Sequence, residues 1–361
     1  AAPPSPRRPE VSRDLEVAEL AEPDFAGWEE FVAKSPDGSA YALPGYLDAL
    51  ASAAGGRFRI LVARRGGEIA GGLPLYEPAG RGRTAGPRLL LYYLSPVLRR
   101  WETTYPSQRT AREVEVLGAL AAALDARGYD RVTLKWQPTL RDVRPFLSRG
   151  WTVRPSYTYV APLGDLGALR SRMEQNLRRL VDRCDRAGLT VSEDDDPTAF
   201  FRLHVEALGR QGQGPYLPAA RFTAFLQRLR AGGLGRLFFA RMPDGAPGAM
   251  QLVLTGPCAG THTVCAGADL EPQRLGASAF LRWRVFEALA AAGHAANDLT
   301  DAALNRVTHF KSQLGADLEL CHVVQSPPSL RWRAAEAGTG LLRRARGLAA
   351  RLRRRPEEER E

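Results

Sequence analysis

The sequence predicts an α/β (α+β) fold in which one unit, a mixed and largely antiparallel sheet flanked by helices, occurs twice in tandem. Two observations support this prediction. In each half, two helical patterns precede an antiparallel hairpin, and a strand, a helix and a further strand follow. The hairpin dipeptide Ala63-Arg64 is repeated as Ala240-Arg241, and the helix-ending Gly128 is matched by Gly293, at nearly equal separations. Such spacing is typical of a duplicated unit.

The length sets the number of domains. A chain of 361 residues is long enough for two cores rather than one. We therefore predict an N-terminal domain at 15–162, a C-terminal domain at 163–326 and a basic helical or disordered tail at 327–361.

In the first half, apolar periodicity predicts helices and local signals fix their ends. Pro44 stands near the start of the second helix, where its missing N–H costs little. The residues Arg64 to Gly67 connect a hairpin, and Gly128 ends the long helix. The expected elements are helices at 24–34 and 44–54, strands at 58–63, 68–76 and 88–94, a helix at 110–127, a strand at 131–136, a helix at 140–148 and a strand at 151–160.

The second half follows the same order. One long helix ends at Gly188, Pro243 to Gly245 turn the hairpin, and Gly293 ends the last long helix. The expected elements are a helix at 166–186, a strand at 189–192, helices at 197–208 and 218–230, strands at 236–241, 249–254 and 261–268, a helix at 277–292 and a strand at 296–299.

The stretch 297–315 is the strongest candidate for chemistry. A short strand passes through a polar turn into a helix that stops at Gly315. This helix carries Lys311, one of three lysines among 50 basic residues. A lysine ammonium is compact, whereas an arginine guanidinium is planar, so the two cannot replace each other at every site. A lysine kept in an arginine-rich chain therefore indicates a specific role. The alternative is a solvated surface lysine.

Composition indicates a globular protein with an anionic partner. The formal net charge is +10 and the pI is about 9.8, which favours nucleic acid, a nucleotide-bearing substrate or an anionic membrane surface. The Arg-rich segment 338–355 is predicted to form a basic amphipathic helix that contacts membrane or RNA, or a solvated tail. No apolar run is long enough to span a membrane, and no secretory signal is evident.

The four cysteines and five histidines lack the spacing of metal ligands. We expect buried or half-buried free thiols, no metal site and a cytoplasmic location.

Three segments resemble the tandem N-acyltransferase (GNAT-like) family that includes the Fem aminoacyltransferases. They are the basic helix 176–191, the segment 275–299, and Phe310-Lys311-Ser312-Gln313-Leu314-Gly315, which is similar to the family's Phe-Lys-x-x-Phe-Gly box. The resemblance extends from about Phe25 to Val324. It implies transfer of an aminoacyl group from aminoacyl-tRNA to an amine, with no covalent enzyme intermediate and no cofactor.

The resemblance makes Lys311 the catalytic candidate. Attack of an amine on an ester carbonyl builds negative charge on oxygen, and a fixed cation there lowers the barrier. Phe310 is predicted to stack on the terminal base of the donor, or else to pack in the core. Neither Ser278 nor Cys265 shows a neighbouring triad pattern, so no nucleophile is expected.

An acyl-CoA donor is the alternative. The run Gln273-Arg274-Leu275-Gly276-Ala277-Ser278 lies between a strand and a helix, as does the loop by which acetyltransferases hold the CoA pyrophosphate. Arg274, Gly276 and Ser278 are therefore donor-binding candidates, with helix capping as a second explanation for Ser278.

For the acceptor, Arg210 and Tyr216 in the second half and Glu102 and Tyr105 in the first are candidates, with Asp298 as a further one. The strand ending Lys135-Trp136-Gln137-Pro138 lacks the carboxylate common in the Fem group, and 45–54 lacks the lysine of muropeptide-adding members. The acceptor class thus stays open between peptidoglycan and peptide natural product biosynthesis. A third, non-catalytic alternative is a module that docks on RNA or an anionic membrane.

Overall fold

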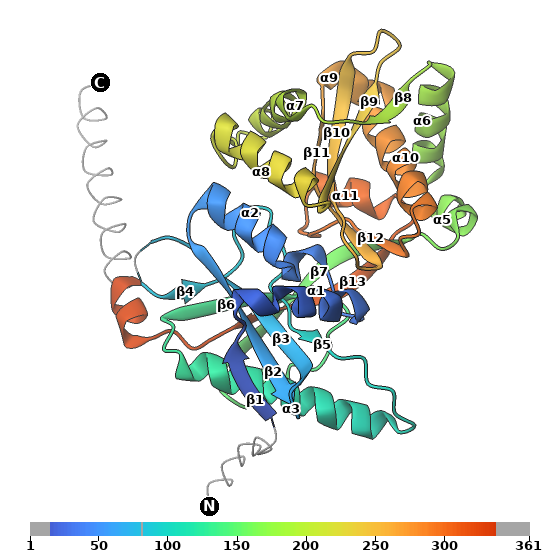
Figure 1. The fold of residues 1–361 in the computed structure, drawn as a ribbon. Helices are drawn as coiled ribbons and strands as arrows, with labels where there is room; N and C mark the ends of the chain where they lie inside the picture. The colour runs from blue at the N-terminus through green and yellow to red at the C-terminus, as the bar shows by residue number, and fades with distance from the viewer. Residues whose placement is uncertain (1–14, 81, 337–361) are drawn as a thin grey trace, which may run out of the picture.

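Two halves of similar build share one long sheet (Figure 1). The structure is a computed structural model and describes residues 15–80 and 82–336. The predicted tail segment 338–355 lies outside the described residues. Among the described helices, none is long and apolar enough to cross a membrane.

The first half contains these elements: β1 (Leu15–Glu19), η1 (Glu22–Asp24), α1 (Phe25–Lys34), η2 (Ala40–Ala42), α2 (Pro44–Ala54), β2 (Arg57–Arg65), β3 (Glu68–Glu77), β4 (Thr84–Ala85), β5 (Val97–Leu98), α3 (Pro106–Ala126), β6 (Arg131–Trp136), α4 (Arg144–Leu147) and β7 (Thr152–Pro162).

The second half contains these elements: α5 (Leu166–Arg172), α6 (Gln175–Arg186), β8 (Thr190–Glu193), α7 (Pro197–Gly209), α8 (Ala219–Ala231), β9 (Gly235–Arg241), β10 (Pro247–Leu254), β11 (Gly260–Ala268), α9 (Leu270–Leu275), α10 (Ala277–Ala291), β12 (Ala296–Asp298), α11 (Arg306–Ser312) and β13 (Asp317–Gln325).

The element order confirms the predicted duplication. Each half runs strand, two helices, hairpin, strand, long helix, strand, short helix and strand, with α3 matching α10. Besides the short helices η1 and η2, only β4 in the first half and α5, α6 and α9 in the second lie outside this common order among the described elements. A four-stranded sheet has the order β1-β2-β3-β5, and a nine-stranded sheet has the order β4-β6-β13-β7-β12-β11-β10-β9-β8. Pairing is antiparallel except between β4 and β6 and between β11 and β12. The fold class is therefore as predicted.

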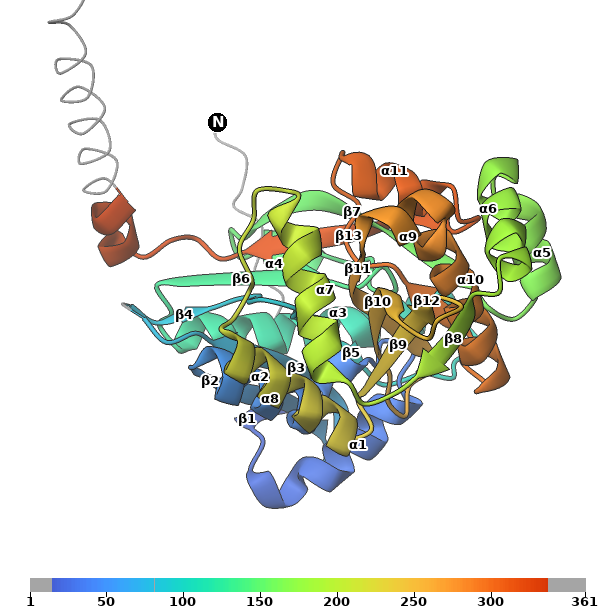
Figure 2. The ribbon, with the colours of Figure 1, turned by 90° about the horizontal axis from the view of Figure 1, so that it is seen from above.

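The last strands of the two halves are exchanged. β13 pairs with β6 of the first half, β7 pairs with β12 of the second, and β7 and β13 pair with each other over nine residues. In Figures 1 and 2 these two strands lie between the halves. The sheet therefore runs across the proposed boundary at residue 162, and that boundary stays a prediction.

Two clusters of buried apolar side chains form the core. One fills the first half and continues onto α7 and α8, and the other lies between α6, α10 and the inner strands of the second half. α2 packs on α8, so helices as well as strands join the halves.

Two sequence predictions are wrong. The expected strand 88–94 is an irregular segment, in which Leu89 has a φ of 52° and Leu91 N donates to the Arg88 carbonyl. Leu90, Leu91, Tyr93 and Leu94 are buried, and within the described residues only Leu94 N of their backbone reaches a strand, donating to the Lys135 carbonyl of β6 at 3.0 Å. The expected helix 166–186 is two helices, because Met173 and Glu174 are extended and Glu174 N donates to the Gln313 carbonyl. The elements β1, β4, β5, α9 and β13 are absent from the prediction, and the helix expected at 140–148 is reduced to α4.

Candidate active site

A cleft opens in the second half where β11 and β12 separate. The two strands pair in parallel only from Gly260 to His262 of β11. β11 then continues to Ala268, while the chain after β12 turns away through Thr300 and Asp301, whose φ angles are 48° and 54°. Left-handed backbone at two non-glycine residues carries strain and persists only where surrounding contacts fix it.

We call this cavity of about 520 Å³ the C-terminal cleft. Its walls come from β10, the end of β11, the C-terminal end of α7, α6, the start of α10, and α11. The polar side chains that line it are Arg210, Gln211, Gln251, Gln273, Ser278, Arg282 and Arg306, and Val307 and Phe310 are among the apolar ones.

Lys311 holds the strained turn that follows the end of β12. Asn305 caps the start of α11 by accepting a hydrogen bond from Thr308 N at 2.9 Å, which orients the helix. The Lys311 ammonium then donates to the carbonyls of Thr300 and of Asp301, the latter at 2.8 Å. Burial, followed by the charge of Arg282, lowers the pKa of Lys311 to about 8. The nitrogen therefore faces the protein interior near Arg282 rather than bulk solvent, but Lys311 itself is not among the residues that line the C-terminal cleft.

A second lysine reaches the same turn. Lys135 Nζ lies 3.5 Å from Asp301 Oδ1 and 5.6 Å from the centroid of the Tyr93 ring. Lys34, in contrast, pairs with Glu30 on the exposed face of α1. Two of the three lysines of the chain thus converge on one turn, although they are far apart in sequence.

Arg282 is the clearest candidate site residue that sequence reasoning missed. It lies on α10, is 5% exposed and lines the C-terminal cleft. Its Nε and Nη1 have no hydrogen-bond partner among the described residues, and burial lowers the pKa of its guanidinium to about 10. A buried cation without a partner is costly. Its place in an apolar helix pattern was the only signal in the sequence.

Side-chain amides and hydroxyls form a chain of hydrogen bonds across β10, β11 and β12. Gln251 of β10 donates to Thr263 at 3.0 Å, and Thr263 donates to Asn297 at 2.9 Å. Asn297 in turn donates to Thr261 at 2.9 Å. These bonds hold Gln251 at the cleft wall with its position fixed by three strands.

The structure brings most predicted donor-binding residues together. Gly276, Ser278 and Phe310 line the C-terminal cleft. Phe310 also packs against the core, and its stacking on a base of the donor stays a prediction. Arg274 does not line the cleft. It is exposed and pairs with Glu271 at 2.7 Å, while its carbonyl accepts a hydrogen bond from Arg183 at 2.8 Å.

The predicted acceptor residues are dispersed. Arg210 lines the cleft and donates to the Ala268 carbonyl. Tyr216 packs on His204, with ring centroids 4.9 Å apart, outside the cleft lining. Glu102 and Tyr105 are exposed in the loop before α3 and do not line it either.

Asp298 is buried beneath the turn. Its carboxylate accepts hydrogen bonds from Tyr93 at 2.8 Å, from Thr158, and from Thr300 N at 2.7 Å. With these donors the residue orders the end of β12, and its role toward an acceptor remains a prediction.

Cys265 has a histidine neighbour that the sequence did not reveal. Its Sγ lies 3.1 Å from His204 Nδ1. Burial raises the pKa of the Cys265 thiol to about 12 and lowers that of His204 to about 4. Both groups are therefore neutral at pH 7, which disfavours a thiolate nucleophile. All four cysteines are free and buried, as expected.

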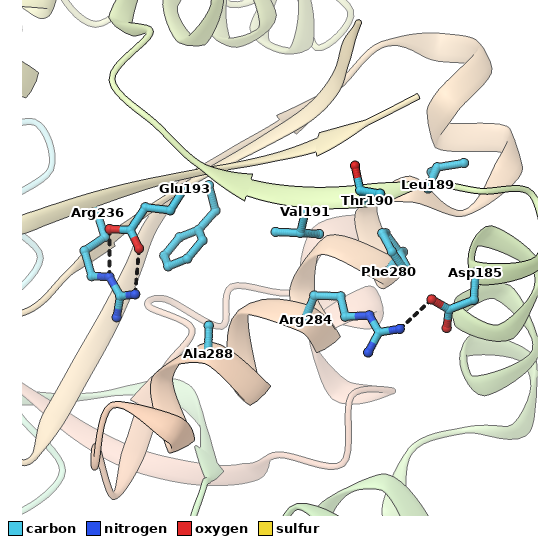
Figure 3. Close-up of a pocket in the computed structure, with 10 residues that line it drawn as sticks. Asp185, Leu189, Thr190, Val191, Glu193, Arg236, Phe280, Arg284 and Ala288 are labelled. Carbon is cyan, nitrogen blue, oxygen red and sulfur yellow. Dashed lines mark hydrogen bonds and ion pairs between the residues drawn. The ribbon is translucent and has the colours of Figure 1, made fainter. Parts of the chain in front are cut away.

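A second groove on this half has its charges already paired. It lies between β8 and α10, where Arg236 pairs with Glu193 and Arg284 pairs with Asp185 (Figure 3). Because each guanidinium in it has a carboxylate partner, this groove offers no free charge to a ligand.

Comparison with known proteins identifies the class. Residues 170–312 match the family model described as an acetyltransferase (GNAT) domain. No curated protein matches the chain. Among solved structures, FemX is similar with a TM-score of 0.65 and 13% identity, over 86% of this chain and 96% of that one.

Two further structures share the fold. The C-terminal domain of an Agrobacterium fabrum protein described as a lysylphosphatidylglycerol synthetase has a TM-score of 0.56 and 14% identity, over 89% of this chain and 96% of that one. A tandem GNAT protein from the clavulanic acid pathway has a TM-score of 0.50 and 16% identity, over 87% and 99%.

The duplicated fold and the match of residues 170–312 to an acetyltransferase (GNAT) domain together indicate an acyltransferase whose second half contains a GNAT domain. Its two GNAT-like halves are arranged in the tandem fold that FemX also has.

Proposed function

We propose that this protein is a Fem-like aminoacyltransferase, which forms an amide bond by moving an aminoacyl group from aminoacyl-tRNA to an amine acceptor. The observation that carries the proposal is Arg282, a buried guanidinium with unpartnered N–H groups in the wall of the C-terminal cleft. Such a group needs an oxygen-rich, anionic ligand to complete its hydrogen bonds.

The cleft suits the 3′ end of a charged tRNA. Phe310 presents an aromatic surface for the terminal base, and base stacking of this kind contributes about 1 to 3 kcal/mol. Arg306 at the rim and Arg282 within offer cations to the phosphate backbone. The charge of +10 supports the same class of donor.

In the reaction, the acceptor nitrogen attacks the ester carbonyl, so that a C–N bond forms and the carbonyl oxygen becomes negative. The C–O bond to the ribose then breaks, and the proton lost by the amine goes to the leaving ribose oxygen. No covalent bond to the enzyme forms, in keeping with the neutral, buried Cys265.

Lys311 is proposed to stabilise the developing oxyanion. An ammonium has three N–H donors, and two of them go to the carbonyls of Thr300 and Asp301. The third is proposed to donate to the oxyanion. The adjacent Arg282 adds a second positive charge at the same place. Fixed cations in a site that excludes water act more strongly than they do in bulk solvent.

An acyl-CoA donor is the second candidate, and one observation favours it. Gln273, Gly276 and Ser278, from the segment that resembles a pyrophosphate-binding loop, all line the C-terminal cleft. Backbone N–H groups at the start of α10 suit a pyrophosphate. We assign the reaction to the cytoplasm, because free thiols favour a reducing compartment. The acceptor is proposed to be an amine of a peptide or a peptidoglycan precursor.

Filter binding separates the donors. Charged tRNA is expected to bind with an affinity that falls steeply with salt, by roughly 0.7 to 0.9 log unit per log unit of salt for each phosphate contacted. Arg282→Met and Arg306→Ala should weaken that binding. Thermal stabilisation by CoA, together with salt-insensitive or absent tRNA binding, would instead support the acyl-CoA donor.

A further inference from the structure

The turn after β12 is held by contacts from both halves of the protein. Thr300 and Asp301 have φ angles of 48° and 54°, and left-handed backbone at such residues persists only where neighbouring contacts maintain it. From the second half, Lys311 of α11 donates to both of their carbonyls. From the first half, Lys135 of β6 reaches the Asp301 carboxylate, although 166 positions separate the two residues in the chain. The turn that holds the Lys311 ammonium is therefore built by both halves.

The fold directs the Lys135 side chain at this turn. β6 pairs with β13, and Lys135 lies opposite Val323 in that pairing. Its neighbours in the strand, Leu134 and Trp136, are fully buried on the opposite face, because successive side chains of a strand alternate in direction. Lys135 thus lies on the face that Tyr93 covers, with its Nζ 5.6 Å from the centroid of that ring.

The Lys135 ammonium has little contact with solvent and one anionic partner. Its side chain is 13% exposed, and its Nζ lies 3.5 Å from Asp301 Oδ1. No other hydrogen bond of this ammonium occurs among the described residues. A charge with so little access to water needs an anion beside it, so we expect the contact with Asp301 to persist. The Asp301 side chain is thereby held against the first half.

Asp301 joins the two lysines. Its carboxylate contacts Lys135, and its carbonyl accepts a hydrogen bond from Lys311 Nζ at 2.8 Å. With the carboxylate anchored on one side, the left-handed backbone of Asp301 keeps the carbonyl on the side of Lys311. Without that anchor the residue can relax toward the right-handed backbone that L-residues prefer, and the carbonyl would turn away from the ammonium.

Charged groups from four parts of the fold act on the Lys311 ammonium. Burial is the main cause of its lowered pKa, and the charges of Arg282 of α10 and Lys135 of β6 lower it further. The carboxylates of Asp301 in the turn and Asp298 of β12 raise it. Lys135 therefore acts on Lys311 directly through its charge as well as through the turn.

We propose that Lys135 is a positioning residue, through which the first half sets the place of the Lys311 ammonium by way of Asp301. The inference rests on the proposed role of Lys311 in acyl transfer, but the state of Lys311 can be measured without any substrate. Lys135 does not line the C-terminal cleft, so its effect on the reaction is exerted through Lys311 rather than through contact with the donor.

Transfer kinetics test the path through Asp301. Lys135→Met is expected to lower kcat about tenfold and to leave the KM for the donor unchanged, because a small displacement of a catalytic group slows the chemical step. Asp301→Asn should have a similar effect, and the double variant should lose no more than either single variant, since both changes remove one contact. Lys135→Arg keeps the charge and should recover most of the rate. Losses that multiply in the double variant would contradict this path.

A measurement without substrate separates this proposal from the proposed function. Selective ¹³C labelling at lysine Cε gives three signals, because the chain has three lysines, and the Lys311 signal reports its titration. Lys135→Met should raise the midpoint, since it removes a nearby positive charge, and Lys135→Arg should leave it unchanged. Lys34→Met, which removes an exposed lysine paired with Glu30, is the matched control and should also leave it unchanged.

Thermal melts establish that each variant is folded. Should Lys135→Met not fold, Asp301→Asn makes the same test with the opposite sign, because it removes a negative charge and should lower the Lys311 midpoint. The positioning role is excluded if Lys311 titrates in the folded Lys135→Met variant as in the wild type, or if Lys34→Met shifts it equally. A shifted Lys311 midpoint in a protein that turns over no donor would support the positioning role and overturn the proposed function alone.

Discussion

At the scale of single residues, the ammonium of Lys311 and the guanidinium of Arg282 dominate the site. Both are largely buried. Burial lowers the pKa of each group because it disfavours charge, and the charge of Arg282 lowers the pKa of Lys311 further. The protein holds these like charges together near a cavity. Ligand chemistry at that cavity is the simplest physical reason for keeping them there.

Lys311→Ala is expected to remove turnover without unfolding the protein, with kcat/KM falling by roughly 10² to 10³, the usual cost of losing an oxyanion donor. Lys311→Arg should not restore full activity, because a planar guanidinium cannot place its donors as an ammonium does. Transfer rates and thermal melts of both variants provide the check. Wild-type activity in the alanine variant would exclude Lys311 as the catalytic cation.

The pH dependence of kcat/KM is expected to follow the titration of the Lys311 ammonium. The Lys311 ammonium, with a pKa of about 8, is charged at pH 7 and loses its charge as the pH rises through that value. The alkaline limb of kcat/KM is therefore expected near pH 8 in the wild type. In Lys311→Arg this limb should move to higher pH, because arginine stays protonated. A limb that does not move would assign the titration to another group.

Arg282→Met is expected to stabilise the fold while weakening donor binding. Replacing a buried, unpartnered cation by an apolar side chain of similar length should raise the free energy of unfolding by about 1 to 3 kcal/mol. Arg284→Met, on the same helix, removes pairs with Asp185 and Glu287 and should have the opposite effect on stability with little effect on the donor. Denaturant titrations and donor-binding assays of the two variants distinguish these outcomes.

At the scale of elements, the junction between α9 and α10 positions the cleft. Gly276 has a φ of 113°, and a Cβ added there would lie 2.9 Å from Leu180 Cβ of α6. The close approach of α6 and α10 therefore depends on this glycine. Arg183 of α6 also donates to the carbonyls of Arg274 and Leu275, which ties the same helix to the loop.

Gly276→Ala is expected to cost more stability than Gly293→Ala, although both glycines have positive φ angles. Gly293 has a φ of 86° and open space around its Cβ position. In Gly293→Ala the free energy of unfolding should therefore fall by only about 1 kcal/mol, the cost of placing a Cβ on left-handed backbone. The Gly276 variant adds a clash with α6, and should lose roughly 2 to 4 kcal/mol together with donor affinity. Equal losses of stability in the two variants would show that α6 moves to accommodate the added methyl group.

At the scale of the whole molecule, the exchange of β7 and β13 joins the halves. Neither half retains its sheet alone, because β12 would lose β7, and β6 would lose β13. We expect a single cooperative unfolding transition. Hydrogen exchange should give equal opening free energies for the amides of β2 and β10, one in each half. A fragment limited to residues 163–336 should fail to fold. Separate transitions for the two halves would contradict this coupling.

The sequence alone determined the duplication and most element types, but not the irregular segment 88–94 or the strands β1 and β13. Local signals such as Pro44, Gly128 and Gly293 act over a few residues, so they can be read without knowing the partners of each segment. The same applies to Phe310 and Ser278, which local motifs singled out and which do line the C-terminal cleft.

Only the tertiary structure decided which charges meet. The convergence of Lys135 and Lys311 on Asp301, the unpartnered Arg282, and the pairing of Cys265 with His204 join residues far apart in the chain. No local pattern encodes such contacts, because they depend on where the strands separate. The exchange of β7 and β13 has the same cause, since strand pairing is a long-range choice that sequence periodicity leaves open.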